Sequence, residues 1–354
     1  MKKVNLSHPL FHLIPAFSLF IFAGCAKENA RYVQQPPAEM QTAEEAAPTE
    51  ELSADEYPQN AKTGTDQSPG TAETVPNEAV QSEETAFDKI PGTSETLIES
   101  VNVEADWSNY FDGLNGAAVI YDPDRQCYQI YNQELALTRR SPCSTFKIIS
   151  SLIALETGII VPGDSARAWS GEVFWNEAWN TDINFTDAFH ASCVWYFREV
   201  IDEIGMDQMQ EELNKLQYGN CDISDWAGRL NTNNSNPMLT GFWIESSLLI
   251  SPKEQTEVME RIFGGHDVYS EETLTQLKQV MLITESAEPD ISIYGKTGMG
   301  KAYGVVVDAW YTGFAEADDK RIYFCVYLGE AAGQNVSSAG AREIAVEIIS
   351  DYLN

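Results

Sequence analysis

Positively charged residues are scarce in this sequence. Its 354 residues include 22 Lys and Arg but 54 Asp and Glu, which gives a formal net charge of -32 at pH 7. Nucleic-acid binding depends on clustered Lys and Arg that neutralise phosphates. The composition therefore argues against nucleic acid as a partner, and the acidic surface is expected mainly to promote solubility.

Histidine is also rare, and the cysteines lack a metal-binding spacing. The four histidines are His8, His12, His190 and His266, and the six cysteines include no Cys-x-x-Cys pair. Zinc sites need closely spaced His, Cys or carboxylate ligands. The sequence therefore argues against a zinc hydrolase, and no metal is predicted. Five cysteines besides Cys25 allow at most two disulfides in an exported protein.

The apolar run near the N-terminus is too short to cross a bilayer well. It covers residues 10–22 and is interrupted by His12 and Pro15, whereas a spanning helix needs about 20 apolar residues. An export signal fits better. The run ends in Ala-Gly-Cys at Cys25, which resembles a bacterial lipoprotein signal. This resemblance implies removal of residues 1–24, lipidation of Cys25 and anchoring of an exported protein to the membrane. Ordinary secretion is the alternative.

The next segment predicts a tether. Residues 25–100 are rich in Glu, Thr, Ala, Pro, Gln and Ser, with few aromatic residues and no hydrophobic period. Such a segment cannot bury enough apolar surface to offset the entropy lost on ordering. We predict a disordered acidic tether, extended by its like charges, ahead of a folded domain at residues 101–354.

Strand patterns occur at both ends of the folded domain, with helical patterns between them. Residues 116–131 read as a β-hairpin, and helices dominate residues 145–280. The other predicted elements are helices at 185–204, 207–216 and 339–352 and strands at 292–297, 305–314 and 322–328. The order predicts an α/β (α+β) fold in which distant segments form one antiparallel sheet flanked by helices, with an inserted helical subdomain and a cleft between the two.

A Ser-x-x-Lys sequence at Ser144 and Lys147 is the first candidate for chemistry. On a helix, residues i and i+3 share a face, so the Lys147 amine can reach the Ser144 oxygen. That is the arrangement of an activated nucleophile. A chain of this length contains about one such pair by chance, and the alternative is an N-cap serine followed by a solvated lysine. The apolar helix at residues 148–155 favours a buried lysine.

Four further motifs follow in order. They are Ser192-Cys193-Val194, Tyr218-Gly219-Asn220, Phe242-Trp243-Ile244-Glu245 and Lys296-Thr297-Gly298. Each has an ordinary explanation as a turn, a strand end or a core segment. Together with the Ser-x-x-Lys motif they closely resemble the class D (oxacillinase-type) serine β-lactamases over residues 102–354. The resemblance implies the fold shared by serine β-lactamases and penicillin-binding transpeptidases, and hydrolysis of β-lactam antibiotics through a serine acyl-enzyme.

The chemistry of this reaction needs a nucleophile, oxyanion donors and a cation for the substrate carboxylate. We predict Ser144 as the nucleophile, with the backbone N–H groups of Ser144 and Met299 as oxyanion donors. The resemblance implies that Ser192 relays a proton to the leaving nitrogen. It also implies that Lys296-Thr297-Gly298 binds the carboxylate together with Arg342. An arginine in a surface salt bridge is the alternative for Arg342.

Lys147 must lose its proton to act as a base, and its ordinary pKa is about 10.4. An apolar wall of Phe146, Val194, Trp243 and Ile244 would lower that pKa by desolvation. The resemblance implies that the free amine adds carbon dioxide to form N6-carboxylysine, held partly by the Trp243 indole. Val194 stands where related penicillin-binding enzymes and class A β-lactamases carry asparagine, and it keeps the pocket dry. No other cofactor is predicted.

Three other functions remain open at this stage. The first is a β-lactam sensor that is acylated without turnover, although full sensors carry several membrane spans and a metalloprotease motif that this sequence lacks. The second is a cell-wall D,D-peptidase, against which Val194 argues, and the third is a non-catalytic surface lipoprotein. The sequence indicates no oligomeric state. A separate hypothesis places Cys143 near Cys193, close enough for a disulfide.

Overall fold

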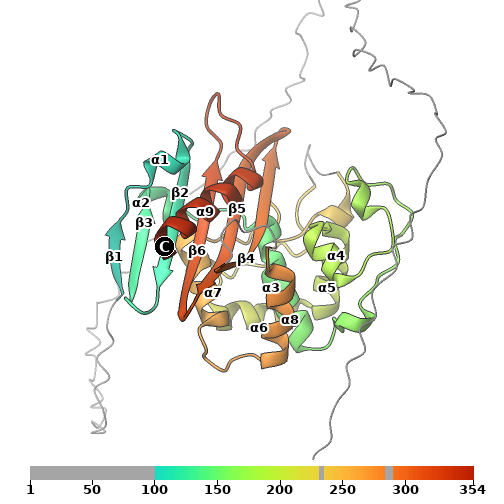
Figure 1. Ribbon diagram of the computed structural model, residues 1–354. Helices are drawn as coiled ribbons and strands as arrows, with labels where there is room; N and C mark the ends of the chain where they lie inside the picture. Colours follow the sequence, from blue (N-terminus) through green and yellow to red (C-terminus); the bar gives the residue numbers. More distant parts are fainter. Residues whose placement is uncertain (1–99, 231–234, 284–289) are drawn as a thin grey trace, which may run out of the picture. The chain divides into compact units, whose positions relative to one another are not determined.

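The computed structural model describes residues 100–230, 235–283 and 290–354. The predicted signal, Cys25 and all but the last residue of the predicted tether lie outside these residues. The described part is built on a six-stranded sheet with the strand order β1-β3-β2-β6-β5-β4 (Figure 1).

The sheet joins segments from both ends of the folded domain, as the sequence predicts. Its strands are β1 (Val101–Glu104), β2 (Gly116–Asp122), β3 (Cys127–Tyr131), β4 (Ile291–Ala302), β5 (Val305–Ala317) and β6 (Lys320–Gly329). Strands β2 and β6 join the N-terminal and C-terminal segments of the sheet. They pair antiparallel, with Gly116 opposite Leu328. All pairs are antiparallel except β1 and β3, which run parallel. Strand β1 was not predicted, since its apolar and polar alternation covers only four residues, all of them exposed.

Helices cover both faces of this sheet. The C-terminal helix α9 (Ser338–Leu353) packs on β4, β5 and β6 and meets α1 (Ser108–Phe111) on the same face. Helix α7 (Pro252–Phe263) packs against β2, β5 and β6. Its start is fixed by a capping box between Ser251 and Glu254 and by Pro252 in the first turn, both common at helix N-termini. These layers confirm the predicted class.

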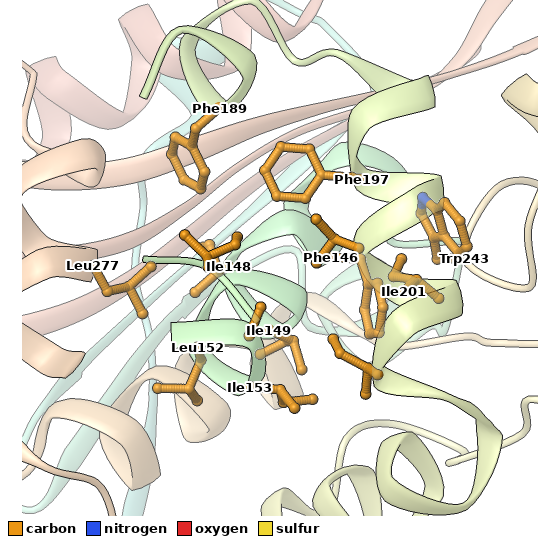
Figure 2. Close-up of a cluster of buried hydrophobic side chains, with 14 of the residues drawn as sticks. Phe146, Ile148, Ile149, Leu152, Ile153, Phe189, Phe197, Ile201, Trp243 and Leu277 are labelled. Atoms are coloured by element: carbon orange, nitrogen blue, oxygen red, sulfur yellow. The ribbon is translucent and has the colours of Figure 1, made fainter. Parts of the chain in front are cut away.

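The short helix α2 (Gln133–Ala136) packs on β2, β3 and α7. The remaining helices form the inserted subdomain between β3 and β4. They are α3 (Lys147–Glu156), α4 (Phe185–His190), α5 (Val194–Ile204), α6 (Met206–Leu216) and α8 (Glu271–Met281), with 3-10 turns η1 (Cys143–Phe146), η2 (Pro162–Asp164), η3 (Glu177–Trp179) and η4 (Pro237–Leu239). Helix α3 contacts both α5 and α8, and every residue from 147 to 154 is buried. Figure 2 shows its apolar side chains between Phe197 and Ile201 on one side and Leu277 on the other. Among the described residues, no helix combines the length and the apolar character needed to cross a membrane.

Two predicted elements are wrong in extent. The helix expected at residues 185–204 is broken between α4 and α5, because Ser192 has φ 55°, a left-handed conformation that an α-helix cannot contain. Cys193 N then donates to Ala188 O at 2.8 Å, which turns the chain before α5 begins. Strand β4 also extends past the predicted residues 292–297 to Ala302, because it stays paired with β5 along its whole length.

Candidate active site

The predicted nucleophile, Ser144, lies in a tight turn directly before α3. The turn is η1, and Lys147 follows it as the first residue of α3. The Lys147 backbone N–H donates to the Ser144 carbonyl oxygen, and Lys147 Nζ lies 2.9 Å from Ser144 Oγ. The structure therefore brings together the two groups that the Ser-x-x-Lys spacing predicts, although Ser144 lies in the 3-10 turn and not in the α-helix.

The segment around Trp243 holds this turn in place. The Trp243 carbonyl oxygen accepts hydrogen bonds from Cys143 N (2.9 Å) and Ser141 Oγ (3.0 Å). The Ser141 hydroxyl oxygen in turn accepts from Glu245 N at 2.8 Å. The buried Trp243 ring also stacks on Phe146, with ring centroids 6.1 Å apart. The Phe-Trp-x-Glu motif thus positions the turn that carries Ser144 through both backbone and ring contacts.

Strand β4 approaches the same turn closely at Gly298. A Cβ atom there would lie 2.9 Å from the Pro142 carbonyl oxygen and 2.9 Å from Thr145 Cγ2. These distances are shorter than ordinary contacts between packed carbon atoms, so any side chain would push β4 away from η1. Glycine at the end of the Lys-Thr-Gly motif is therefore required by close packing.

Lys147 is buried, as the apolar helix predicts, with 1% of its surface exposed. Its Nζ lies 5.4 Å from the centroid of the Phe197 ring. Burial lowers the pKa of Lys147 to about 8, while the nearby thiols of Cys193 and Cys143 oppose this shift. An amine with this pKa is partly neutral at neutral pH and can accept the Ser144 proton.

Phe197 was not among the predicted site residues. It lies three residues after Val194, about one turn along α5. Residues i and i+3 share a helix face, so a valine facing Lys147 places Phe197 beside the same amine. This spacing was the available signal.

Ser192 and Lys296 meet on the other side of the site. Lys296 Nζ donates to Ser192 Oγ at 3.1 Å and to Thr297 O at 3.2 Å, and lies 5.6 Å from the centroid of the Phe189 ring. Burial, and secondly the charge of Lys147, lower the pKa of Lys296 to about 7. The sequence treated Lys296 only as a carboxylate ligand, whereas the structure also couples it to Ser192 and Lys147.

Ser144 opens onto a cleft of about 390 Å³, which we call the Ser144 cleft. Three predicted residues line it with Ser144: Val194, Ile244 and Met299. Phe146 and Trp243, predicted with Val194 and Ile244 as an apolar wall around the Lys147 amine, are buried and do not line this cleft. The rest of the lining is Cys143, Trp175, Trp179, Leu239, Glu245, Lys301 and Gly304. Much of this rim comes from segments without a recognised motif.

A second pocket, of about 280 Å³, lies beside β4, and we call it the Arg342 pocket. Lys296, Thr297 and Arg342 all line it, together with Gly295 and Tyr311. The structure therefore places three of the predicted carboxylate-binding residues around one space, although they come from β4 and α9, whereas Gly298 does not line it. Ser144 does not line this pocket and belongs to the neighbouring cleft.

The cysteines form no disulfide in the described part of the chain. Cys127, Cys143, Cys193, Cys221 and Cys325 are all free thiols. The hypothesis of a bridge between Cys143 and Cys193 is therefore not supported, although both thiols lie close enough to Lys147 to affect its pKa. Within the same residues, no group of three or more His, Cys, Asp or Glu is arranged to hold a metal ion.

Comparison with known proteins identifies both sensors and enzymes with this architecture. Regulatory protein BlaR1 of Bacillus licheniformis is 31% identical over 256 residues, which are 71% of this chain and 40% of BlaR1. The chain thus spans about two fifths of the length of that relative. The solved C-terminal domain of the Bacillus licheniformis BlaR penicillin-receptor has a TM-score of 0.62 and 29% identity, covering 72% of this chain and 98% of that one.

An enzyme structure is equally similar in fold. The class D β-lactamase from Sebaldella termitidis has a TM-score of 0.62 and 27% identity, covering 72% of this chain and 98% of the enzyme. The family described as penicillin binding protein transpeptidase domain matches residues 112–350. The matched residues include the Ser144 and Lys147 pair, and the chain belongs to the penicillin-binding-protein transpeptidase domain family, with class D β-lactamases and BlaR receptors among its relatives.

Proposed function

We propose that this protein is a β-lactamase that hydrolyses β-lactams through an acyl-enzyme on Ser144. The observation that carries the proposal is the buried amine of Lys147, 2.9 Å from Ser144 Oγ and with a pKa lowered to about 8. A lysine with an ordinary pKa would be almost fully protonated at neutral pH and could not act as a base.

Acylation follows from this pair. Lys147 accepts the Ser144 proton as Oγ attacks the lactam carbonyl, and the N–H groups of Ser144 and Met299 stabilise the oxyanion. The carbon–nitrogen bond then breaks, and the nitrogen takes a proton through Ser192. The contact of Ser192 with Lys296 at 3.1 Å supports this relay, because Lys296 has a pKa near 7 and can resupply the proton.

Hydrolysis of the acyl-enzyme needs a base that stays beside Ser144. The carbamate that class D enzymes form on this lysine would supply that base if it were present on Lys147 before acylation, and it would then also accept the Ser144 proton in place of the free amine. The Trp243 indole is the proposed donor that holds it. The site fits such a group because the amine is buried and partly neutral, and carbon dioxide adds only to a neutral amine. Val194 lines the cleft and offers no hydrogen bond to the lysine, so it does not favour the charged ammonium.

The Arg342 pocket is the proposed site for the substrate carboxylate. Lys296, Thr297 and Arg342 provide two cations and a hydroxyl around one space. Charged and hydroxyl donors of this kind are the usual partners of a carboxylate.

A β-lactam sensor is the second candidate, and the similarity to the BlaR penicillin-receptor favours it. Both candidates require acylation of Ser144, and they differ in whether the acyl group is removed. We favour the enzyme because the site contains a group that can serve as a base for deacylation.

Turnover distinguishes the two. The purified protein is mixed with a chromogenic cephalosporin, and product is followed over many multiples of the enzyme concentration. Sustained release supports the enzyme, and a single stoichiometric burst supports the sensor. Ser144→Ala is the control, and mass spectrometry should find no acyl adduct on it. Absence of both turnover and adduct in the unmodified protein would rule out both candidates.

We further propose that the protein is exported and anchored to the cell membrane through lipidated Cys25. The support is the sequence alone. A Cys25→Ala variant should be recovered in the soluble fraction while the unmodified protein sediments with membranes. Equal membrane association of the two proteins would contradict the anchor.

A further inference from the structure

The side chain of Tyr311 crosses β4, the edge strand of the sheet, because Gly295 of β4 has no side chain. Tyr311 lies on β5 opposite Thr297 of β4, and β4 ends the strand order of the sheet. A Cβ atom at Gly295 would lie 2.6 Å from Tyr311 Cζ and 2.7 Å from its hydroxyl oxygen. The Tyr311 ring therefore passes over Gly295, and its hydroxyl group lies over β4 although the residue belongs to β5.

The hydroxyl of Tyr311 is buried and unsatisfied. The residue is 1% exposed, and its oxygen has no hydrogen-bond partner within the described residues. Three other buried side chains share this condition there: Ser151, Tyr218 and Trp310. Neither the Ser144 cleft nor the Arg342 pocket is lined by any of those three, whereas Tyr311 lines the Arg342 pocket. A buried polar group without a partner destabilises the fold, and a ligand in the pocket would provide the missing partner.

The surroundings of this hydroxyl select a negatively charged group. Lys296, Thr297 and Arg342 line the same pocket. Burial raises the pKa of Tyr311, and the positive charge of Arg342 only partly opposes that rise. The phenol therefore stays protonated at neutral pH and can donate one hydrogen bond.

We propose that Tyr311 is a substrate-binding residue whose hydroxyl donates to the carboxylate of the bound β-lactam, beside Thr297 and Arg342. This inference rests on the proposed function. It adds a third element, β5, to a subsite that the sequence assigned to β4 and α9, and it explains why β4 carries glycine at position 295.

The test compares a charged with a neutral substrate. Acylation rate constants are measured for benzylpenicillin and its methyl ester with the unmodified protein and with Tyr311→Phe. A hydrogen bond to a charged group is worth about tenfold or more in rate, so the variant should lose about tenfold with the acid and little with the ester. Its thermal midpoint should not fall, because the substitution removes an unsatisfied group.

A matched control is Tyr269→Phe. The Tyr269 hydroxyl donates to Glu212 at 2.8 Å, and neither residue lines the Arg342 pocket. This variant should leave the ratio of acid to ester rates unchanged. Equal losses with both substrates in Tyr311→Phe, or no loss at all, would overturn the inference.

A binding measurement separates this inference from the proposed function. In a Ser144→Ala background, calorimetry with benzylpenicillin should show weaker binding when Tyr311→Phe is added, and no such change with the ester. If the unmodified protein were not acylated at all, the proposed function would fail while this comparison still decided the role of Tyr311. Unchanged affinity for the acid would refute that role.

Discussion

Replacing Lys147 by methionine should stabilise the protein, and the gain should depend on pH. Burial lowers the pKa of this amine from 10.5 to about 8. At about 1.36 kcal/mol for each pKa unit, the folded state disfavours the ammonium by about 3 kcal/mol. Methionine has a similar length and carries no charge, so Lys147→Met removes this penalty.

The sign of the pH dependence follows from the two pKa values. Below about pH 8 the lysine is protonated in both the folded and unfolded states, and the full penalty is present. Between about pH 8 and 10.5 the unfolded chain binds a proton that the folded protein does not, so the stability of the unmodified protein rises with pH. The advantage of the variant should therefore be largest at pH 7 and should shrink by about 3 kcal/mol at pH 10.5.

The measurement is urea unfolding of both proteins at several pH values between 6 and 10.5, in buffers freed of bicarbonate. The charge of Lys147 also lowers the pKa of Lys296, so both proteins are measured again with Lys296→Met to remove that second titration. Lys215→Met is the control, because Lys215 pairs with Glu212 at 3.4 Å and its side chain is 41% exposed, unlike that of Lys147. An advantage of Lys147→Met that does not change between pH 7 and 10.5 would show that the amine is not buried as described.

Three further predictions concern catalysis. Activity of the unmodified protein lost after removal of carbon dioxide at low pH should return with bicarbonate, and ¹³C-labelled bicarbonate should give a carbamate signal that Lys147→Met lacks; a protein indifferent to bicarbonate would contradict the carbamate. In Val194→Asn, the new amide should hydrogen-bond to Lys147 and draw water to it, so turnover should fall about tenfold or more. Acylation should persist, and mass spectrometry should detect the trapped adduct. Unchanged turnover would show that Val194 does not control the state of Lys147. Gly298→Ala should displace β4 from the Pro142 carbonyl. Misplacement of a reacting group by about 1 Å lowers the rate about 100-fold, so the acylation rate should fall strongly. Retention of the unmodified rate would show that the close approach of β4 to η1 is not needed.

The sequence predicted the elements whose signals are local. The hairpin at 116–131 and the strands near the C-terminus are short runs rich in apolar and aromatic residues, and their assembly into one sheet is confirmed by the pairing of β2 with β6. The single helix predicted across residues 185–204 is wrong at Ser192, because Ser192 has a positive φ and no glycine or proline marks this break in the sequence.

The candidate site likewise has contacts that the sequence could predict and contacts that it could not. Ser144 and Lys147 are three residues apart, so helical geometry alone brings their side chains together, and the apolar residues that follow predicted the burial of the amine. The spacing of Phe197 from Val194 could have indicated that Phe197 lies near that amine, but no spacing could show that Lys296 contacts Ser192, because that contact joins elements separated by many residues.

By itself, then, the sequence predicted the Ser144 and Lys147 pair and determined the family, since these depend on residue types at short, fixed spacings. The tertiary structure alone decided which distant groups share a space: Lys296 with Ser192, and Arg342 with Thr297 and Tyr311. The physical reason is that side-chain periodicity reports which face of one helix or strand is buried, whereas the partner of that face is selected by packing of the whole core. The proposed function rests on the first kind of information, and the proposed role of Tyr311 rests on the second.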